Sequence, residues 1–290
     1  MRYEGVIYRP PSEANSLLIQ ATIGCPHNLC TFCAIYKKTK FRVRPVEEIK
    51  EDLRAARDRY GEGIRSIFFP DGNTIAMKTD NLCRVLDYTR ELFPRLERIT
   101  VYGSARFIVR KTFQEMQRLR EAGLNRIHVG LESGDDTILT AIRKGATAQE
   151  MVAAGLMVKE AGMELSEYVL MGIGGPGRSR EHALASAGVL NAIDPHFIRI
   201  RTFIPRPGSP LFEKCQRGEF QLVSPHGILN EIKLMIENLQ VNSQVSSDHV
   251  SNYWDIRGRL PGERDLMLQE IDVALKVPEE LLEQARYGGI

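Results

Sequence analysis

The sequence predicts an α/β fold made of repeated strand–helix units. Apolar runs typical of buried strands alternate with segments of helical length and pattern along most of the chain. Strands that are joined by helices pair in parallel through right-handed crossovers, and continuously apolar strands are typical of a parallel sheet covered by helices. A chain of 290 residues is long enough to form one large domain of this kind.

Six strands and the helices between them are predicted in order along the chain. The strands span residues 16–23, 64–69, 98–102, 126–131, 165–171 and 197–204. The helices span residues 46–60, 80–93, 111–122, 147–161 and 179–191. Acidic residues in the first turns of the helix at 46–60 suit its N-terminus, and Gly123 and Gly162 follow two other helices as C-terminal stops.

A doubly wound sheet and a curved barrel share this periodicity, so the pattern alone leaves both open. Polar and reactive residues, however, follow one predicted strand after another. In parallel α/β barrels the reactive groups gather at the C-terminal ends of the strands. The residues at those ends are Cys25, Asp71, Ser104, Glu132 and the glycines of segment 172–177.

Three cysteines, Cys25, Cys30 and Cys33, lie within nine residues on a loop that leaves the first predicted strand. Thiolates at this density are what an iron–sulfur cluster requires, and three of them leave one iron of a [4Fe–4S] cluster open for chemistry. Zinc is the alternative, with His27 as a fourth ligand, but no second ligand pair follows downstream. A disulfide is disfavoured because the chain has five cysteines and no signal peptide precedes them.

The segment from Cys25 to Cys33 resembles the signature of the radical S-adenosylmethionine (radical SAM) superfamily, in which three cysteines are separated by three and then two residues. Phe32 matches the aromatic residue before the last cysteine, and the first gap holds four residues, one more than usual. The resemblance runs through the strand at 197–204. It implies a partial (β/α)6 barrel, a [4Fe–4S] cluster on Cys25, Cys30 and Cys33, and S-adenosylmethionine on the open iron. The implied reaction is reductive cleavage of S-adenosylmethionine to a 5′-deoxyadenosyl radical that abstracts hydrogen from a substrate.

By the same resemblance, the ends of the second and third strands hold S-adenosylmethionine. The stretch 70–73 stands where relatives carry glycines and an acid, so Asp71 and Asn73 are expected to face the methionine ammonium. A simple turn between strand and helix is the alternative. Ser104, which follows the third strand, is a similar candidate.

The fourth strand ends in a stretch that resembles methylthiotransferases, elongator-type acetyltransferase relatives and oxygen-independent coproporphyrinogen oxidases. The resemblance implies that Glu132 accepts hydrogen bonds from the ribose, as carboxylates do in dinucleotide folds; a helix cap is the alternative. Lys144 matches a basic residue that reaches the cofactor carboxylate, or it compensates a helix dipole. Gly172 begins a glycine-rich run that lets backbone approach the adenine, and Phe32 completes the expected binding set.

Residues 1–225 are predicted to form the barrel, and residues 226–290 a helical extension packed on it. The helices of the extension are predicted at 228–239 and 263–275. Between them lies a polar and aromatic cluster of His249, Asn252, Tyr253 and Trp254. We expect some of these side chains to cover the barrel opening, because a radical must be shielded from water; a packing role is the alternative.

Charge and hydropathy restrict the class of partner. Lys and Arg number 39 against 37 Asp and Glu, a net charge of +2, which disfavours a nucleic-acid substrate because phosphate contacts require clustered cations. No apolar stretch reaches the roughly 18 residues of a membrane span. We therefore expect a cytoplasmic enzyme that acts on a small or medium organic substrate and takes electrons from a donor such as flavodoxin or ferredoxin. The alternative is a non-catalytic iron–sulfur or zinc protein that carries or senses a small molecule, or that only transfers electrons. No motif identifies a residue that reacts with the substrate.

Overall fold

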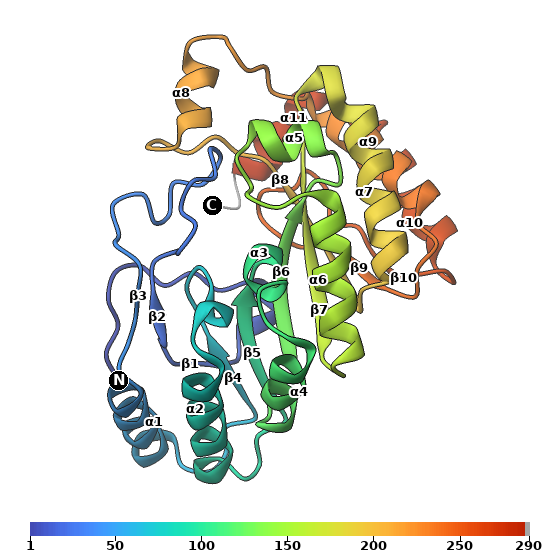
Figure 1. Cartoon of the computed structure of the whole chain (residues 1–290). Helices are drawn as coiled ribbons and strands as arrows, with labels where there is room; N and C mark the ends of the chain where they lie inside the picture. The colour runs from blue at the N-terminus through green and yellow to red at the C-terminus, as the bar shows by residue number, and fades with distance from the viewer. Residues whose placement is uncertain (288–290) are drawn as a thin grey trace. The chain divides into compact units, whose positions relative to one another are not determined.

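The computed structural model describes residues 1–287, with side chains through residue 284 (Figure 1). The chain divides into two compact units. The first comprises Met1–Asn28, Lys38–Val129 and Leu156–Leu165, and the second comprises Leu29–Lys37, Gly130–Gly155 and the chain from Ser166 onward. In the part of the chain that is described, no helix is both long enough and apolar enough to cross a membrane.

The main sheet has eight strands in the order β1-β4-β5-β6-β7-β8-β9-β10. Neighbours β1–β4, β4–β5, β5–β6, β7–β8 and β8–β9 pair in parallel, and β9 pairs with β10 antiparallel. These strands span Leu17–Leu18 (β1), Ser66–Phe69 (β4), Arg98–Gly103 (β5), Arg126–Glu132 (β6), Glu164–Met171 (β7), Phe197–Thr202 (β8), Gln244–Ser246 (β9) and Arg257–Arg259 (β10). The predicted α/β fold with a mainly parallel sheet is thus confirmed.

Helices follow the strands as the periodicity predicts. They span Val46–Tyr60 (α1), Thr79–Leu92 (α2), Ala105–Ile108 (α3), Phe113–Glu121 (α4), Asp136–Ala141 (α5), Ala148–Glu160 (α6), Ser179–Ile193 (α7), Pro210–Gln216 (α8), Pro225–Asn238 (α9), Arg264–Ala274 (α10) and Glu279–Tyr287 (α11). The sequence patterns missed α3, α5 and α8, which are too short to show a helical period, and they also missed α11. Gly123 and Gly162 have positive φ just beyond α4 and α6, as expected of helix stops.

The predicted strand at 16–23 is wrong as one element. Its first half, Leu17–Leu18, pairs in parallel with β4, whereas Thr22–Ile23 (β2) forms a separate antiparallel pair with Arg42–Val43 (β3). The two short strands that flank the cysteine loop, β2 and β3, are therefore paired with each other. An apolar run shows that a segment is extended and buried, but it does not show which strand is its partner.

In the first unit, the sheet register separates polar and aromatic side chains from aliphatic ones. Tyr102 lies opposite His128 in the ladder, and the rings of Phe68 and Tyr102 meet edge to face with centroids 5.0 Å apart. On the other face, Val101 lies opposite Ile127, and both are fully buried. Helices α1, α2 and α4 run along these strands (Figure 1).

In the second unit, β7, β8 and β9 form a parallel ladder in which Phe197 lies opposite both Ser166 and Gln244. Helices α7 and α9 pack side by side, and α10 packs against α9 (Figure 1). The apolar face of α9, which includes Ile232 and Met235, is buried. Because β9 and β10 follow α9, the last part of the chain contributes strands as well as helices to this unit.

Candidate cofactor site

The cysteine loop carries Cys25, Cys30 and Cys33, all partly exposed. Cys25 belongs to the first unit, whereas Cys30 and Cys33 belong to the second. The backbone N–H of Gly72 donates to the carbonyl of Gly24 at 3.1 Å, and a Cβ at position 72 would stand 2.6 Å from the Cβ of Cys25. A glycine is therefore required where this strand end meets the loop.

The second part of the loop is anchored by backbone bonds. The N–H of Thr31 donates to the carbonyl of Ile142 at 2.8 Å, and the carbonyl of Thr31 accepts from the N–H of Leu211 at 2.9 Å. The Nζ of Lys37 donates to the carbonyl of Cys30 at 2.9 Å. These bonds hold Cys30 and its neighbours without using the thiols.

In the first unit, the predicted residues Asp71, Asn73 and Ser104 lie at neighbouring strand ends. The side-chain amide of Asn73 donates to Ser104 Oγ at 2.9 Å. The other amide atom, Asn73 Oδ1, is a buried acceptor with no hydrogen-bond partner among the described residues. Asp71 is 2 % exposed and has a left-handed backbone conformation, with φ at +75°. Strained backbone of this kind is typical of functional positions.

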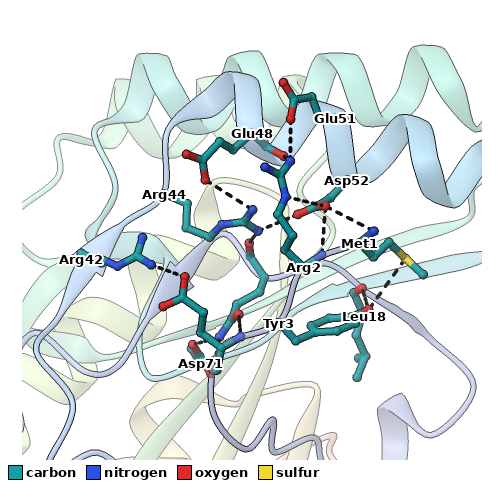
Figure 2. A network of polar contacts seen from close by, with 12 residues as sticks. Met1, Arg2, Tyr3, Leu18, Arg42, Arg44, Glu48, Glu51, Asp52 and Asp71 are labelled. Carbon is teal, nitrogen blue, oxygen red and sulfur yellow. Dashed lines mark hydrogen bonds and ion pairs between the residues drawn. The ribbon is translucent and has the colours of Figure 1, made fainter.

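Asp71 is also held by the N-terminal segment of the chain, as Figure 2 shows. The Nε2 of Gln20 donates to Asp71 Oδ2 at 2.6 Å. The backbone of Glu4 fixes that amide, because its N–H donates to Gln20 Oε1 at 2.8 Å and its carbonyl accepts from Gln20 Nε2 at 3.2 Å. The carbonyl of Gln20 accepts from Arg44 at 2.7 Å, and Arg44 pairs with Asp52 of α1 at 2.8 Å.

In the second unit, Glu132 and Lys144 form a pair at the end of β6. Lys144 Nζ donates to Glu132 Oε1 at 2.9 Å, and Glu132 has a left-handed backbone with φ at +62°. A Cβ at Gly130 would stand 2.1 Å from Glu132 Oε1 and 2.9 Å from Lys144 Nζ, so only glycine allows both side chains to fold back over the strand. Burial alone would lower the pKa of Lys144, but the negative charges of Glu132 and Cys30 outweigh it and raise that pKa.

The glycine-rich run follows β7, as predicted. Gly172 has a positive φ of +78°, and its N–H donates to Glu231 Oε1 at 2.7 Å. A Cβ at this position would stand 2.7 Å from the Cδ1 of Ile228. The sequence pattern shows the glycine but not its partners on α9, which come from the end of the chain.

Comparison with known proteins decides the family. The Radical SAM superfamily model matches residues 19–188, which include the three cysteines and the predicted strand ends through Gly172. This chain belongs to the radical SAM superfamily. Members of the superfamily use a [4Fe–4S] cluster and S-adenosylmethionine.

Two curated relatives illustrate the range of radical SAM proteins that this chain resembles. It is 28% identical over 201 residues to an uncharacterized methyltransferase of Pyrococcus horikoshii. This alignment covers 68% of this chain and 41% of the relative. It is 24% identical over 253 residues to a tRNA-2-methylthio-N(6)-dimethylallyladenosine synthase of Nitrosomonas europaea. This alignment covers 82% of this chain and 54% of the relative. The chain thus spans about half the length of the curated relatives it matches.

Solved structures agree on the fold. Methylornithine synthase superposes with a TM-score of 0.57 at 18% identity, covering 88% of this chain and 68% of that one. Coproporphyrinogen III oxidase from Escherichia coli, a radical SAM enzyme, superposes with a TM-score of 0.56 at 17% identity. The superposition covers 77% of this chain and 51% of the oxidase chain. At these identities the likeness shows a shared radical SAM fold, in accord with the predicted partial barrel.

The residues present fit the cofactors of the radical SAM superfamily. Three cysteines on one loop supply the soft sulfur donors that an iron–sulfur cluster requires. The unpartnered Asn73 Oδ1 is a buried acceptor that a ligand N–H or O–H would satisfy. Among the side chains that the structure describes, no three of the types His, Cys, Asp or Glu already stand close enough together to hold a metal ion.

The sequence patterns did not identify one acidic residue near this radical SAM site. Glu167 on β7 is 1 % exposed, and its Oε2 has no hydrogen-bond partner among the described residues. Burial raises the pKa of Glu167 to about 8; Lys144 opposes this shift and Glu132 adds to it. A charged residue inside an otherwise apolar strand pattern was the signal that could have identified it.

The structure anchors the predicted substrate-cover cluster to β8 of the second unit. The Nδ2 of Asn252 donates to the carbonyls of Ile200 and Ser247, both at 2.8 Å, and its Oδ1 accepts from the Thr202 hydroxyl at 3.0 Å. His249 is hydrogen-bonded to Arg201. The amide of Asn252 is thus already fully used, while Tyr253 and Trp254 are partly exposed.

Proposed function

We propose that this chain is a radical SAM enzyme in which Cys25, Cys30 and Cys33 hold the [4Fe–4S] cluster and the neighbouring strand ends bind S-adenosylmethionine. Together these cofactors supply reductive cleavage of a carbon–sulfur bond and a radical that abstracts hydrogen from the substrate. The observation that carries the proposal is the family match across the three cysteines and the polar strand ends. Residues 1–225 would form the barrel, and residues 226–290 the extension.

Residues of the first unit would bind the methionine part of the cofactor. Asp71 offers a carboxylate to the ammonium group, oriented by the amide of Gln20. Asn73 offers its buried Oδ1 as a second acceptor, while Ser104 fixes the amide from the other side. A preorganised pair of acceptors avoids the ordering cost of binding a flexible cation.

Residues of the second unit would bind the nucleoside and the carboxylate of the cofactor. Glu132 accepts from the ribose hydroxyls, and its contact with Lys144 holds both side chains in place. Lys144 remains charged because of Glu132, and it can therefore attract an incoming carboxylate. Gly172 would allow backbone to approach the adenine, with Phe32 beside the cluster.

We propose a small or medium organic substrate and a one-electron donor such as flavodoxin or ferredoxin in the cytoplasm. The net charge of +2 supports this class over a nucleic acid, since phosphate contacts draw on an excess of cations. The tRNA-modifying relative extends well beyond the part matched here, so its name does not transfer to this chain. His249, Asn252 and Tyr253 are proposed to cover the substrate opening.

Anaerobic reconstitution tests the proposed activity. The wild-type chain should bind about four irons and, with a reductant, release 5′-deoxyadenosine from S-adenosylmethionine. Cys30→Ala should lose both properties, whereas Cys83→Ala, on α2 and outside the site, should keep both. Zinc in the anaerobically purified protein together with no cleavage product would overturn the proposal. If adding S-adenosylmethionine leaves the paramagnetic spectrum of the cluster unchanged, the non-catalytic alternative is favoured.

A further inference from the structure

A buried carboxylate on α9 contacts the glycine run that follows β7. Glu231 is 2 % exposed. Its Oε1 accepts from the N–H of Gly172 at 2.7 Å, and its Oε2 accepts from the hydroxyl of Ser179 at the start of α7. A helix from the last quarter of the sequence therefore holds the backbone of a predicted cofactor-binding glycine.

The same carboxylate lies next to a buried histidine on α7. Nε2 of His182 is 3.5 Å from Glu231 Oε1, and its Nδ1 is 2.8 Å from Ser133 Oγ. Ser133 Oγ also accepts from the N–H of Asp135 at 3.1 Å, so the Ser133 side chain joins its own turn to α7. Nε2 of His182 lies on the side of the Glu231 carboxylate.

These contacts connect two loops that are far apart in sequence. Ser133 directly follows Glu132 at the end of β6, and Gly172 follows β7. The turn after β6 also sits against α7: the N–H of Gly134 donates to Ser186 Oγ at 3.0 Å, and a Cβ at position 134 would stand 2.2 Å from the carbonyl of Ala185. The loop at Gly172 is therefore held from α9, and the turn at Ser133 is held from α7.

We propose that Glu231 and His182 are positioning residues that hold the loops at Ser133 and Gly172 in the geometry required to bind S-adenosylmethionine. The inference rests on the proposed function, and it extends that function to a helix outside the segment matched by the family model. Neither side chain needs to touch the cofactor. Each acts through a backbone or hydroxyl group of a residue next to the binding surface.

Simple packing does not account for this arrangement. Burial raises the pKa of Glu231 to about 7 and lowers the pKa of His182 to about 4, so both groups are held where charge is unfavourable. Apolar side chains of similar volume would stabilise a helix interface at least as well. The polar groups instead fix directions, because hydrogen bonds are lost when the donor and acceptor move apart.

The experiment compares two substitutions in the reconstituted full-length protein. Glu231→Gln keeps an acceptor for the Gly172 N–H, whereas Glu231→Met keeps the volume and removes every polar contact. Glu231→Met should weaken S-adenosylmethionine binding about tenfold, the effect of losing one or two buried hydrogen bonds, with iron content unchanged. Glu231→Gln should stay within about twofold of the wild type, because the acceptor is restored.

Ile236→Ala is the matched control on the same helix. Ile236 is fully buried and its side chain makes no hydrogen bond, so its truncation should lower the melting temperature without changing cofactor affinity. Equal loss of affinity in Ile236→Ala and Glu231→Met, or wild-type affinity in Glu231→Met, would overturn the proposal.

Amide hydrogen exchange separates this inference from the proposed activity, since it needs no cofactor. Residues 132–135 and 172–177 should exchange faster in Glu231→Met than in Glu231→Gln or Ile236→Ala. Faster exchange in a protein that never binds S-adenosylmethionine would contradict the proposed function but leave the positioning role of Glu231 intact. Unchanged exchange in Glu231→Met would contradict the positioning role itself.

Discussion

Each unit buries one glutamate–histidine pair, and the two pairs behave in opposite ways. In the first unit Glu13 is fully buried and its Oε1 lies 3.2 Å from His128 Nε2. In the second unit Glu231 is 2 % exposed and lies 3.5 Å from His182. The residue types, burial and distances are nearly the same.

The difference lies in the groups around each carboxylate. Burial would raise the pKa of Glu13, but hydrogen bonds from His128 and Ser16 lower it, and electrostatic interactions with His128 and with Arg98, 3.2 Å away, lower it further, to about 2. The groups bonded to Glu231 are neutral donors, and burial raises its pKa to about 7. The hydrogen-bond donors and charges around each carboxylate, and not its depth, therefore decide the direction of the shift.

Arg98→Met should have the largest effect on stability, because it removes the guanidinium that pairs with the buried Glu13. We expect a loss of about 3 kcal/mol in the free energy of unfolding, measured with urea at pH 7. Arg65→Met is the control, since it breaks an exposed pair with Glu97 and should change stability by less than about 0.5 kcal/mol. Similar losses in the two variants would show that Glu13 does not depend on Arg98.

The pH dependence of stability should have opposite signs in the two networks. Glu13 has a folded pKa below its usual 4.5, so its stabilising contribution is complete above pH 4.5 and is lost as the pH falls toward about 2. Glu231 has a raised folded pKa, so its contribution is complete below pH 4.5 and is lost as the pH rises through about 7. Each effect is worth about 2 kcal/mol after allowance for relaxation.

Two conservative substitutions should separate these slopes. Glu13→Gln should flatten the urea-derived stability between pH 2 and 4.5, and Glu231→Gln should flatten it between pH 4.5 and 7. If both variants change the same pH range, the contrast between the two pairs is wrong.

Gln20→Met tests whether the first unit also positions its part of the cofactor site. The substitution removes the hydrogen bond to Asp71 and should raise the KM for S-adenosylmethionine about fivefold with kcat unchanged, which is the effect of one hydrogen bond. Arg42→Met, which breaks only an exposed pair with Glu4, should alter the KM by less than about twofold. An unchanged KM in Gln20→Met would mean that Asp71 needs no positioning.

Tyr253→Ala should have the smallest effect. If the His249–Trp254 segment covers the substrate opening, cleavage of S-adenosylmethionine without substrate should rise about twofold while iron content stays constant. The exposed Val250→Ala is the control. Identical uncoupled cleavage in both variants would assign the segment a packing role.

Local sequence patterns were enough to predict much of the fold and of the candidate site. Three cysteines at close spacing, a family signature and polar residues after successive apolar strands identified the superfamily and the candidate residues from Cys25 to Gly172. The helix predicted at 46–60 coincides with α1. Such features are encoded by neighbouring residues, because helical period, strand composition and loop chemistry all act over short stretches.

Tertiary structure alone decided which partners hold those residues. Gln20 meets Asp71 across 51 positions, Gly172 meets Glu231 across 59, and Glu13 meets His128 across 115. The split of the first predicted strand arises in the same way, from pairing with β3 across the cysteine loop. Nothing in a local pattern specifies a partner at such separation; packing of the strands and helices brings the groups together, and their charges then set how each carboxylate behaves.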